Sequence, residues 1–546
     1  IVGPIVLNGA PVAPWSGEVG TNPMRYNAGV LGGTWLPMLF SDLGAGKFDG
    51  ANLVMNFELL NPSRNYFGKY YDLFAKVDTE RARFIDFERW WGGFFSLNET
   101  EIRWIVEELF VGNKLVRHSA ELEPGRPVDI KAIRAPIIVF ASHGDNITPP
   151  QQALNWIPDT YADVDEIRIC GQRIIYMVHE EVGHLGIFVS SRIAKKEHSE
   201  VTSTMKTIEA LPPGLYEMKI DAAEGEGINR SFIVSFAERT LDDIRTIDDN
   251  REDEKAFGAV ARASEAQAEL YETWMRPLVQ NMVTEPMAET MRAFHPLRTQ
   301  RAMMSSRNPL VAPLHAIADN VRQDRHPVPA DNPFALAEKT FASLFQQSID
   351  MFRDVRDASY EMTFFSLWGT PQARNYGRPN AEQRTLKSKE ELRALPQVQA
   401  VLAHIRSGGF VQAVIRMLVY LAGSRGGVRR DRLERSGRVL TQDEPFRSLP
   451  MEERVRIINE QDLIATFEFE QGIETLPLLL KDKKDRELAM GVVQYIVGPI
   501  GEMAPHSLDM IQRFRDALGL KPMSEDTAAD PLAAEAATAG AETAAE

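Results

Sequence analysis

The chain has 546 residues, enough for three or four compact domains of ordinary size. Apolar residues make up 44% of it and charged residues 25%, a composition typical of globular proteins. Its 61 basic and 77 acidic side chains give a formal charge of −16, which argues against a protein that binds DNA or RNA through a basic surface.

Cysteine content and hydropathy indicate the cellular setting. Cys170 is the only cysteine, so no internal disulfide can form and a reducing cytoplasm is expected. The most apolar stretch, residues 410–421, contains Gln412 and Arg416 and is shorter than the roughly 18 apolar residues of a membrane span. We therefore expect a buried helix there, and a cytoplasmic protein without a transmembrane segment.

The first elements read as strands of a parallel sheet. Residues 5–7, 136–141 and 174–178 are nearly continuous runs of β-forming apolar residues, as expected of strands buried on both faces. The chain begins inside such a run, at Ile1, without a signal peptide. This start favours the interpretation that the sequence is the carboxy-terminal part of a longer protein.

About 125 residues separate the first two predicted strands, far more than one crossover helix requires. This insert is aromatic, because residues 1–115 hold 19 of the chain's 47 aromatic side chains. The aromatic residues could form the core of a helical subdomain. They could also form a cap over an apolar pocket, hinged at pairs such as Gly92-Gly93, and the two interpretations are compatible.

After the third strand, residues 215–220 and 231–236 predict a strand pair. Seven of the 13 residues in 242–254 are acidic, which indicates a solvated boundary. Beyond residue 255 the periodicity becomes helical, and apolar side chains that recur every four residues predict a helix packed against a partner helix. These side chains are Leu270, Trp274, Leu278 and Met282.

The strongest signal for chemistry is an acid followed by a histidine. Asp145 follows the second long strand directly, and His184 lies in Gly183-His184 after the third strand. A carboxylate at a strand end can orient an imidazole, which then acts as a general base for a nucleophile. The order acid then histidine is that of α/β hydrolases. Taken singly, the Asp could be only a helix cap and the Gly-His only a turn.

Two other patterns do not support a site. His179 and His184 resemble a zinc-protease motif, but they are five residues apart rather than four, and strand-like sequence precedes them. No Gly-x-Ser-x-Gly or Gly-x-Cys-x-Gly nucleophile turn occurs in the chain. Cys170 follows the acid and is expected to be a buried structural cysteine, within or at the end of a strand. We expect neither a metal nor a cofactor, and His143 is expected to pack near the site.

Six short motifs follow one another in the first part of the chain. They are Trp90-Trp91, Ile102-Arg103-Trp104, residues 109–115, residues 128–136, residues 145–149 and Gly183-His184. Taken together, these motifs resemble the carboxyl half of poly(3-hydroxyalkanoate) synthases, over about residues 1–195. The whole chain looks like a bacterial group labelled 3-hydroxyalkanoate synthetase-like.

The resemblance implies an α/β-hydrolase core with a Cys–Asp–His triad and a cap inserted before the acid. The synthases' acid corresponds to Asp145 and their histidine to His184, and their cysteine would lie upstream of Ile1. This sequence departs from the synthases in a longer gap between acid and histidine and in the helical half beyond Lys255. The segment 256–366 loosely resembles phasins, which coat polyester granules.

The predicted fold class is therefore α/β, a partial α/β-hydrolase core with an inserted aromatic cap, followed by an all-α carboxy-terminal half. The expected divisions are 1–240 for the hydrolase part, with the cap at about 20–130, 256–380 for a helical region, 387–520 for a helical bundle, and 524–546 for a disordered acidic tail rich in alanine.

We expect an acyltransferase or esterase acting on hydroxyacyl thioesters or esters, with Asp145 and His184 as the catalytic residues in this chain. Because the nucleophile is expected upstream, residues 1–546 alone should be inactive. The alternative is a non-catalytic binding or scaffold protein associated with polyester granules. Self-association is a further expected interaction.

Overall fold

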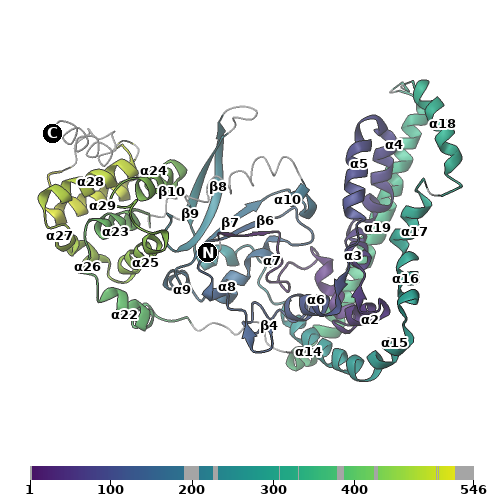
Figure 1. The fold of residues 1–546 in the computed structure, drawn as a ribbon, viewed down its shortest axis with the longest axis horizontal. Helices are drawn as coiled ribbons and strands as arrows, with labels where there is room; N and C mark the ends of the chain where they lie inside the picture. The colour runs from purple at the N-terminus through teal and green to yellow at the C-terminus, as the bar shows by residue number, and fades with distance from the viewer. Residues whose placement is uncertain are drawn as a thin grey trace. The chain divides into compact units, whose positions relative to one another are not determined.

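The computed structural model contains two compact units, each assembled from separate stretches of the sequence (Figure 1). Unit 1 comprises residues 1–17, 116–250 and 381–546, and unit 2 comprises 18–115 and 251–380. The segments expected as consecutive helical regions, 256–380 and 387–520, thus belong to different units. The structure describes residues 3–522 except 190–207, 209, 225–230, 307, 327, 330, 378–385, 423–427, 500 and 502. The predicted disordered tail, 524–546, lies outside the described residues.

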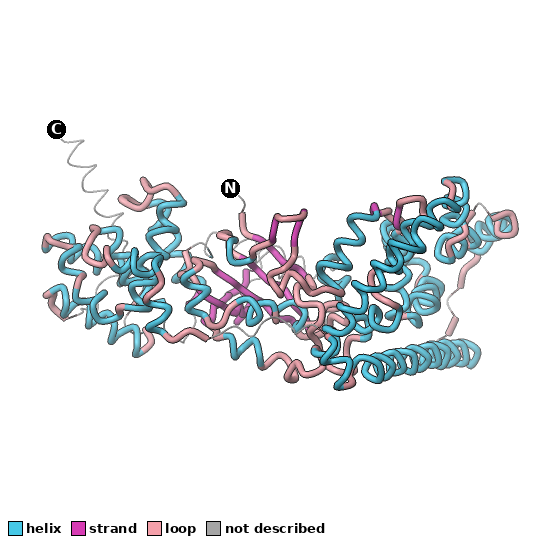
Figure 2. The backbone as a smooth tube through the Cα atoms, turned by 90° about the horizontal axis from the view of Figure 1, so that it is seen from below, coloured by secondary structure: helices cyan, strands magenta, loops and turns pink. Residues whose placement is uncertain are grey.

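Unit 1 is built around a six-stranded sheet of order β1-β6-β7-β8-β9-β10, drawn as magenta strands in Figure 2. The first four strands run parallel to one another, and the last two pair antiparallel. The prediction of a mostly parallel sheet in a mixed α/β protein is therefore confirmed. The elements of this part are β1 (Ile5–Asn8), β4 (Glu121–Glu123), β5 (Arg126–Pro127), β6 (Ile137–Ser142), α7 (Pro150–Leu154), α8 (Trp156–Thr160), α9 (Val164–Ile169), β7 (Arg173–His179), α10 (His184–Val189), β8 (Gly214–Glu224), β9 (Ser231–Glu238) and α13 (Leu241–Arg245).

The central strands form because their side chains are apolar on both faces. All six residues of β6 are buried, which is the pattern of a strand covered on both sides. Its Ile138 and Phe140 share one buried cluster with Ile175 and Met177 of β7 and with Ile187 of α10. This cluster fixes α10 against the sheet, directly beyond the end of β7.

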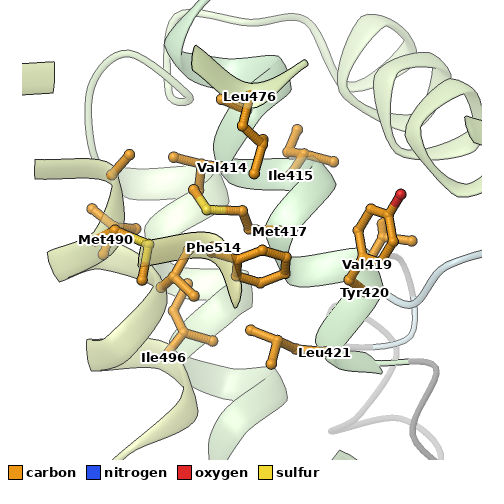
Figure 3. Close-up of a cluster of buried hydrophobic side chains, with 14 of the residues drawn as sticks. Val414, Ile415, Met417, Val419, Tyr420, Leu421, Leu476, Met490, Ile496 and Phe514 are labelled. Carbon is orange, nitrogen blue, oxygen red and sulfur yellow. The ribbon is translucent and has the colours of Figure 1, made fainter. Parts of the chain in front are cut away.

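The carboxy-terminal helices of unit 1 form a bundle with its own core, shown in Figure 3. The predicted buried helix at 410–421 is confirmed as α23 (Phe410–Ala422), which packs against α25 and α28. The bundle joins the sheet through β10 (Val428–Arg429), which pairs with β9. Its helices are α21 (Lys389–Arg393), α22 (Pro396–Leu402), α24 (Arg430–Gln442), α25 (Met451–Phe467), α26 (Phe469–Glu474), α27 (Leu476–Leu479), α28 (Lys483–Val497) and α29 (Pro505–Leu518).

Unit 2 is helical and combines the aromatic insert with residues 251–380. Its elements are α1 (Asn27–Leu31), α2 (Trp35–Leu43), β2 (Lys47–Phe48), α3 (Gly50–Leu60), α4 (Lys69–Ala75), α5 (Val77–Trp91), β3 (Leu97–Asn98), α6 (Glu99–Trp104), α14 (Lys255–Leu270), α15 (Arg276–Met282), α16 (Glu285–Ala293), α17 (Pro296–Met303), α18 (Ala312–Gln323), α19 (Pro333–Trp368) and α20 (Pro371–Tyr376).

Aromatic and polar contacts bind the two stretches of unit 2 together. The ring of Tyr26 lies 4.9 Å from that of Phe364 and 6.0 Å from that of Phe257. The backbone amide of Thr34 donates to the Ser264 hydroxyl at 2.8 Å. Part of the aromatic insert is thus the core of a helical unit, as one of the two interpretations required.

Much of the apolar surface of residues 255–380 stays exposed in unit 2. Leu270, Trp274, Leu278 and Met282 are between 59% and 74% exposed, so no partner helix within the described residues covers this predicted stripe. Among the described residues, no helix has the length and apolar content needed to cross a bilayer.

Candidate functional site

The site is assembled at one edge of the unit 1 sheet, where β6 and β7 end. The two strands are parallel neighbours whose last residues, Ser142 and His179, are paired in register. Asp145 lies three residues beyond β6, and His184 is the first residue of α10 after β7. Because parallel strands end at the same edge, both side chains arrive at one place.

Asp145 and His184 meet directly. Asp145 Oδ2 lies 2.8 Å from His184 Nδ1, so the predicted contact between the two side chains is confirmed. Asp145 Oδ1 accepts backbone N–H bonds from Ile147 and Thr148, each at 2.8 Å. One carboxylate oxygen therefore caps the following turn, while the other orients the imidazole.

The environment of the pair differs between its two members. The Asp145 side chain is fully buried, whereas 20% of the His184 side chain is exposed. A buried carboxylate must have its oxygens hydrogen-bonded, and the two amides and the imidazole satisfy this need. The pair thus joins a buried carboxyl group to an imidazole that solvent still reaches.

Gly144 allows the two strand-end loops to approach each other. A Cβ atom at Gly144 would lie 2.4 Å from the carbonyl carbon of Glu181, too close for any side chain. The loop after β6 therefore lies against the backbone of the loop after β7. This contact brings Asp145 within reach of His184.

Sequence reasoning did not identify Gly9, which lies against the pair from the end of β1. Its φ is +52°, a left-handed conformation that favours glycine. A Cβ here would lie 3.2 Å from Asp145 Oδ2, 3.3 Å from His184 Nδ1 and 3.1 Å from Ile187 Cδ1. The available signal was a glycine two residues after the first predicted strand, directly beyond Asn8.

Gly9→Ala is expected to lower the free energy of unfolding by about 1–2 kcal/mol, from left-handed backbone strain, and also to displace the Asp145–His184 contact. Gly125→Ala is the matched control, because Gly125 has a φ of +79° but nothing within 4 Å of its added Cβ. Urea unfolding of both variants measures the loss of unfolding free energy that backbone strain causes in each. Loss of the histidine's native NMR shift should occur only in Gly9→Ala, and an unchanged shift would contradict the contact.

The other candidate residues lie away from the pair. Cys170 follows α9 rather than lying in or at the end of a strand, so that prediction is wrong. It is half-buried, and burial raises the pKa of its thiol. It precedes the start of β7 whereas His184 follows its end, and a seven-residue strand spans roughly 20 Å. Cys170 therefore cannot be a nucleophile for this histidine.

His179 and His143, the two other histidines considered from the sequence, also lie outside the pair. His179 ends β7 and His184 begins α10, so the two are not on one helix as a zinc-protease motif requires. His143 is exposed and lines a polar recess of about 390 Å³ that includes neither Asp145 nor His184. The recess is lined by His143, Tyr176, Val178, Glu180, Glu217, Arg239, Asp243 and Ile247.

Residues 1–406 match a family described as "Protein of unknown function (DUF3141)". The chain belongs to this family. It is also 38% identical over 534 residues to a Rhizobium meliloti protein described as "Uncharacterized protein in ackA 5'region", covering 95% of this chain and 73% of that protein.

A second relative has a more specific description. The chain is 25% identical over 142 residues to the poly(3-hydroxyalkanoate) polymerase subunit PhaC of Haloferax mediterranei. That match covers 26% of this chain and 27% of the polymerase subunit. No solved structure matches the chain.

Proposed function

We propose that the chain carries the acid and histidine of an α/β-hydrolase-type acyltransferase or esterase that acts on hydroxyacyl substrates. The observation that carries this proposal is the Asp145–His184 pair, 2.8 Å apart at the ends of adjacent parallel strands. The partial similarity to a poly(3-hydroxyalkanoate) polymerase subunit supports the hydroxyacyl substrate class.

In this proposal His184 is the general base. With Nδ1–H donating to Asp145 Oδ2, the imidazole accepts the nucleophile's proton at Nε2. The buried Asp145 carboxylate stabilises the imidazolium that results, and the Ile147 and Thr148 amides keep the carboxylate from rotating away. The imidazolium then returns the proton to the leaving group.

The nucleophile is a thiol or hydroxyl that attacks the acyl carbonyl to form a covalent acyl intermediate. The chain contains no Gly-x-Ser-x-Gly or Gly-x-Cys-x-Gly turn, and Cys170 is at the wrong end of β7. We therefore place the nucleophile in a segment that precedes Ile1, as in the resemblance to the synthases. The stretch of about residues 20–130, most of which belongs to unit 2, is proposed as the cap, in a cytoplasmic enzyme.

Thioester turnover tests this function. The complete protein is expected to release coenzyme A from 3-hydroxybutyryl-coenzyme A, whereas residues 1–546 alone are expected to release none. Free thiol is measured against time for both proteins at equal concentration. Release by residues 1–546 that Asp145→Asn abolishes would overturn the proposed location of the nucleophile.

A non-catalytic role at polyester granules is the second candidate. It is favoured by exposed apolar side chains on and around α16–α18, since Phe294, Met304 and Leu310 are 75%, 76% and 85% exposed. Binding to poly(3-hydroxybutyrate) particles by a complete protein that releases no coenzyme A would favour this candidate over the enzyme.

A further inference from the structure

The longest helix of the described residues has one face that no described residue of unit 2 covers. Helix α19 has 36 residues, about 54 Å of continuous helix, and is the long straight helix at the lower right of Figure 2. Seven large apolar side chains along it are at least 59% exposed. We call six of them, all except Phe352, the α19 stripe. They are Phe334, Phe341, Leu344, Met351, Val355 and Met362.

The spacing of the α19 stripe is that of a coiled coil. Successive members are separated by seven, three, seven, four and seven residues, and the positions that this pattern skips are Ala337, Ser348 and Ala358. Apolar residues that alternate three and four apart over four or more heptads keep one seam facing a partner helix. Binding to a flat surface would not require apolar side chains to recur every 3.5 residues.

The opposite face of α19 is already anchored within unit 2. Trp368 Nε1 donates to the Gly29 carbonyl at 2.8 Å, and Arg356 donates to the Leu59 carbonyl at 2.9 Å. The ring of Phe345 lies 4.8 Å from that of Phe67. These contacts hold the helix so that the α19 stripe faces outward.

Charge argues against a lipid surface as the partner. Helix α19 carries five acidic and three basic residues, and the chain as a whole has a formal charge of −16. Amphipathic helices that lie on membranes are rich in Lys and Arg, which attract anionic lipids. The α19 stripe itself contains no charged residue, which suits the apolar seam of a protein interface.

We propose that the α19 stripe is the interface of a homodimer, in which it packs against the same stripe of a second copy of this chain. A second copy supplies a helix of matching length and heptad register through a twofold, self-complementary contact. Phe334, Phe341 and Met351 of the stripe are 84%, 65% and 69% exposed and together present on the order of 400 Å². That is about half of the roughly 800 Å² that each partner buries in a stable interface.

Sedimentation of the complete protein tests the dimer. The wild type is expected at twice the monomer mass at micromolar concentration. Phe341→Glu with Met351→Glu puts two charges into the seam and should raise the dissociation constant at least about 100-fold. Phe74→Glu is the matched control, because Phe74 is 66% exposed on α4, outside the α19 stripe, and it should leave the dimer unchanged.

Loss of the dimer in the double variant could come from a disrupted interface or from misfolding. A variant that binds its partner more tightly distinguishes these two explanations. Ser348→Leu replaces an exposed polar side chain within the seam and should lower the dissociation constant about tenfold. A monomeric wild type, or a double variant that remains dimeric, would overturn the proposal. So would a monomer that binds phosphatidylcholine–phosphatidylglycerol vesicles through the α19 stripe.

Discussion

Asp145→Asn is expected to lower kcat/KM for a hydroxyacyl thioester by about 10³- to 10⁴-fold in the complete protein. The asparagine oxygen can still accept the Ile147 and Thr148 amides, so its NH₂ group then faces His184 Nδ1. This arrangement makes Nδ1 an acceptor and leaves the proton on Nε2. The imidazole can then no longer take a proton from the nucleophile.

The matched control is Asp163→Asn. Asp163 caps α9, and its Oδ1 accepts the Glu166 amide at 2.8 Å. Among the described residues, no histidine forms a hydrogen bond with Asp163. Its substitution removes a carboxylate from a comparable cap and should change kcat/KM less than twofold. Equal losses in the two variants would show that Asp145 acts only as a cap.

Arg416→Met is expected to destabilise the carboxy-terminal bundle by about 3–5 kcal/mol. Arg416 is completely buried, and burial lowers its pKa to about 10. Its guanidinium donates to Gln461 Oε1 at 2.7 Å, to Thr475 Oγ1 at 2.8 Å and to the carbonyls of Ile405 and Gly472. Methionine fills a similar volume but removes the donor from Gln461 Oε1, Thr475 Oγ1 and the Ile405 carbonyl. The Gly472 carbonyl still accepts from the Thr475 hydroxyl at 3.2 Å.

Hydrogen exchange measured by mass spectrometry locates the effect of Arg416→Met. Amides of α23 and α25 should exchange at least several hundred-fold faster than in the wild type, because the expected loss of unfolding free energy raises the population of the opened bundle. Arg456→Met is the control, because the Arg456 side chain on α25 is 60% exposed and its ion pairs contribute little. Unchanged exchange in Arg416→Met would show that the bundle does not depend on this buried cation.

The sheet and the acid–histidine pair could be predicted because their signals are local. Runs of Ile and Val predict buried parallel strands, and the strand ends then bring Asp145 and His184 to one edge. Gly9 belongs to the same site, but its contact with the pair depends on strand order. Strand order depends on pairing between distant segments, which no local pattern contains.

The long-range organisation could not be predicted for the same reason. The acidic stretch 242–254 indicated a solvated boundary, yet Glu254 is completely buried and Asp253 nearly so. Arg25, more than 200 residues earlier, pairs with Asp253, and Arg251 pairs with Glu254 at 2.7 Å. A charge run can be buried when a distant segment supplies the opposite charge.

The measurement that tests the central claim most directly is thiol release from 3-hydroxybutyryl-coenzyme A by the complete protein carrying His184→Gln or His143→Gln. Both residues follow strands that end at the same edge of the sheet, but of the two only His184 contacts Asp145. The account predicts that His184→Gln abolishes release, while His143→Gln retains at least half of the wild-type rate. Equal rates in the wild type and His184→Gln would contradict a catalytic role for the pair.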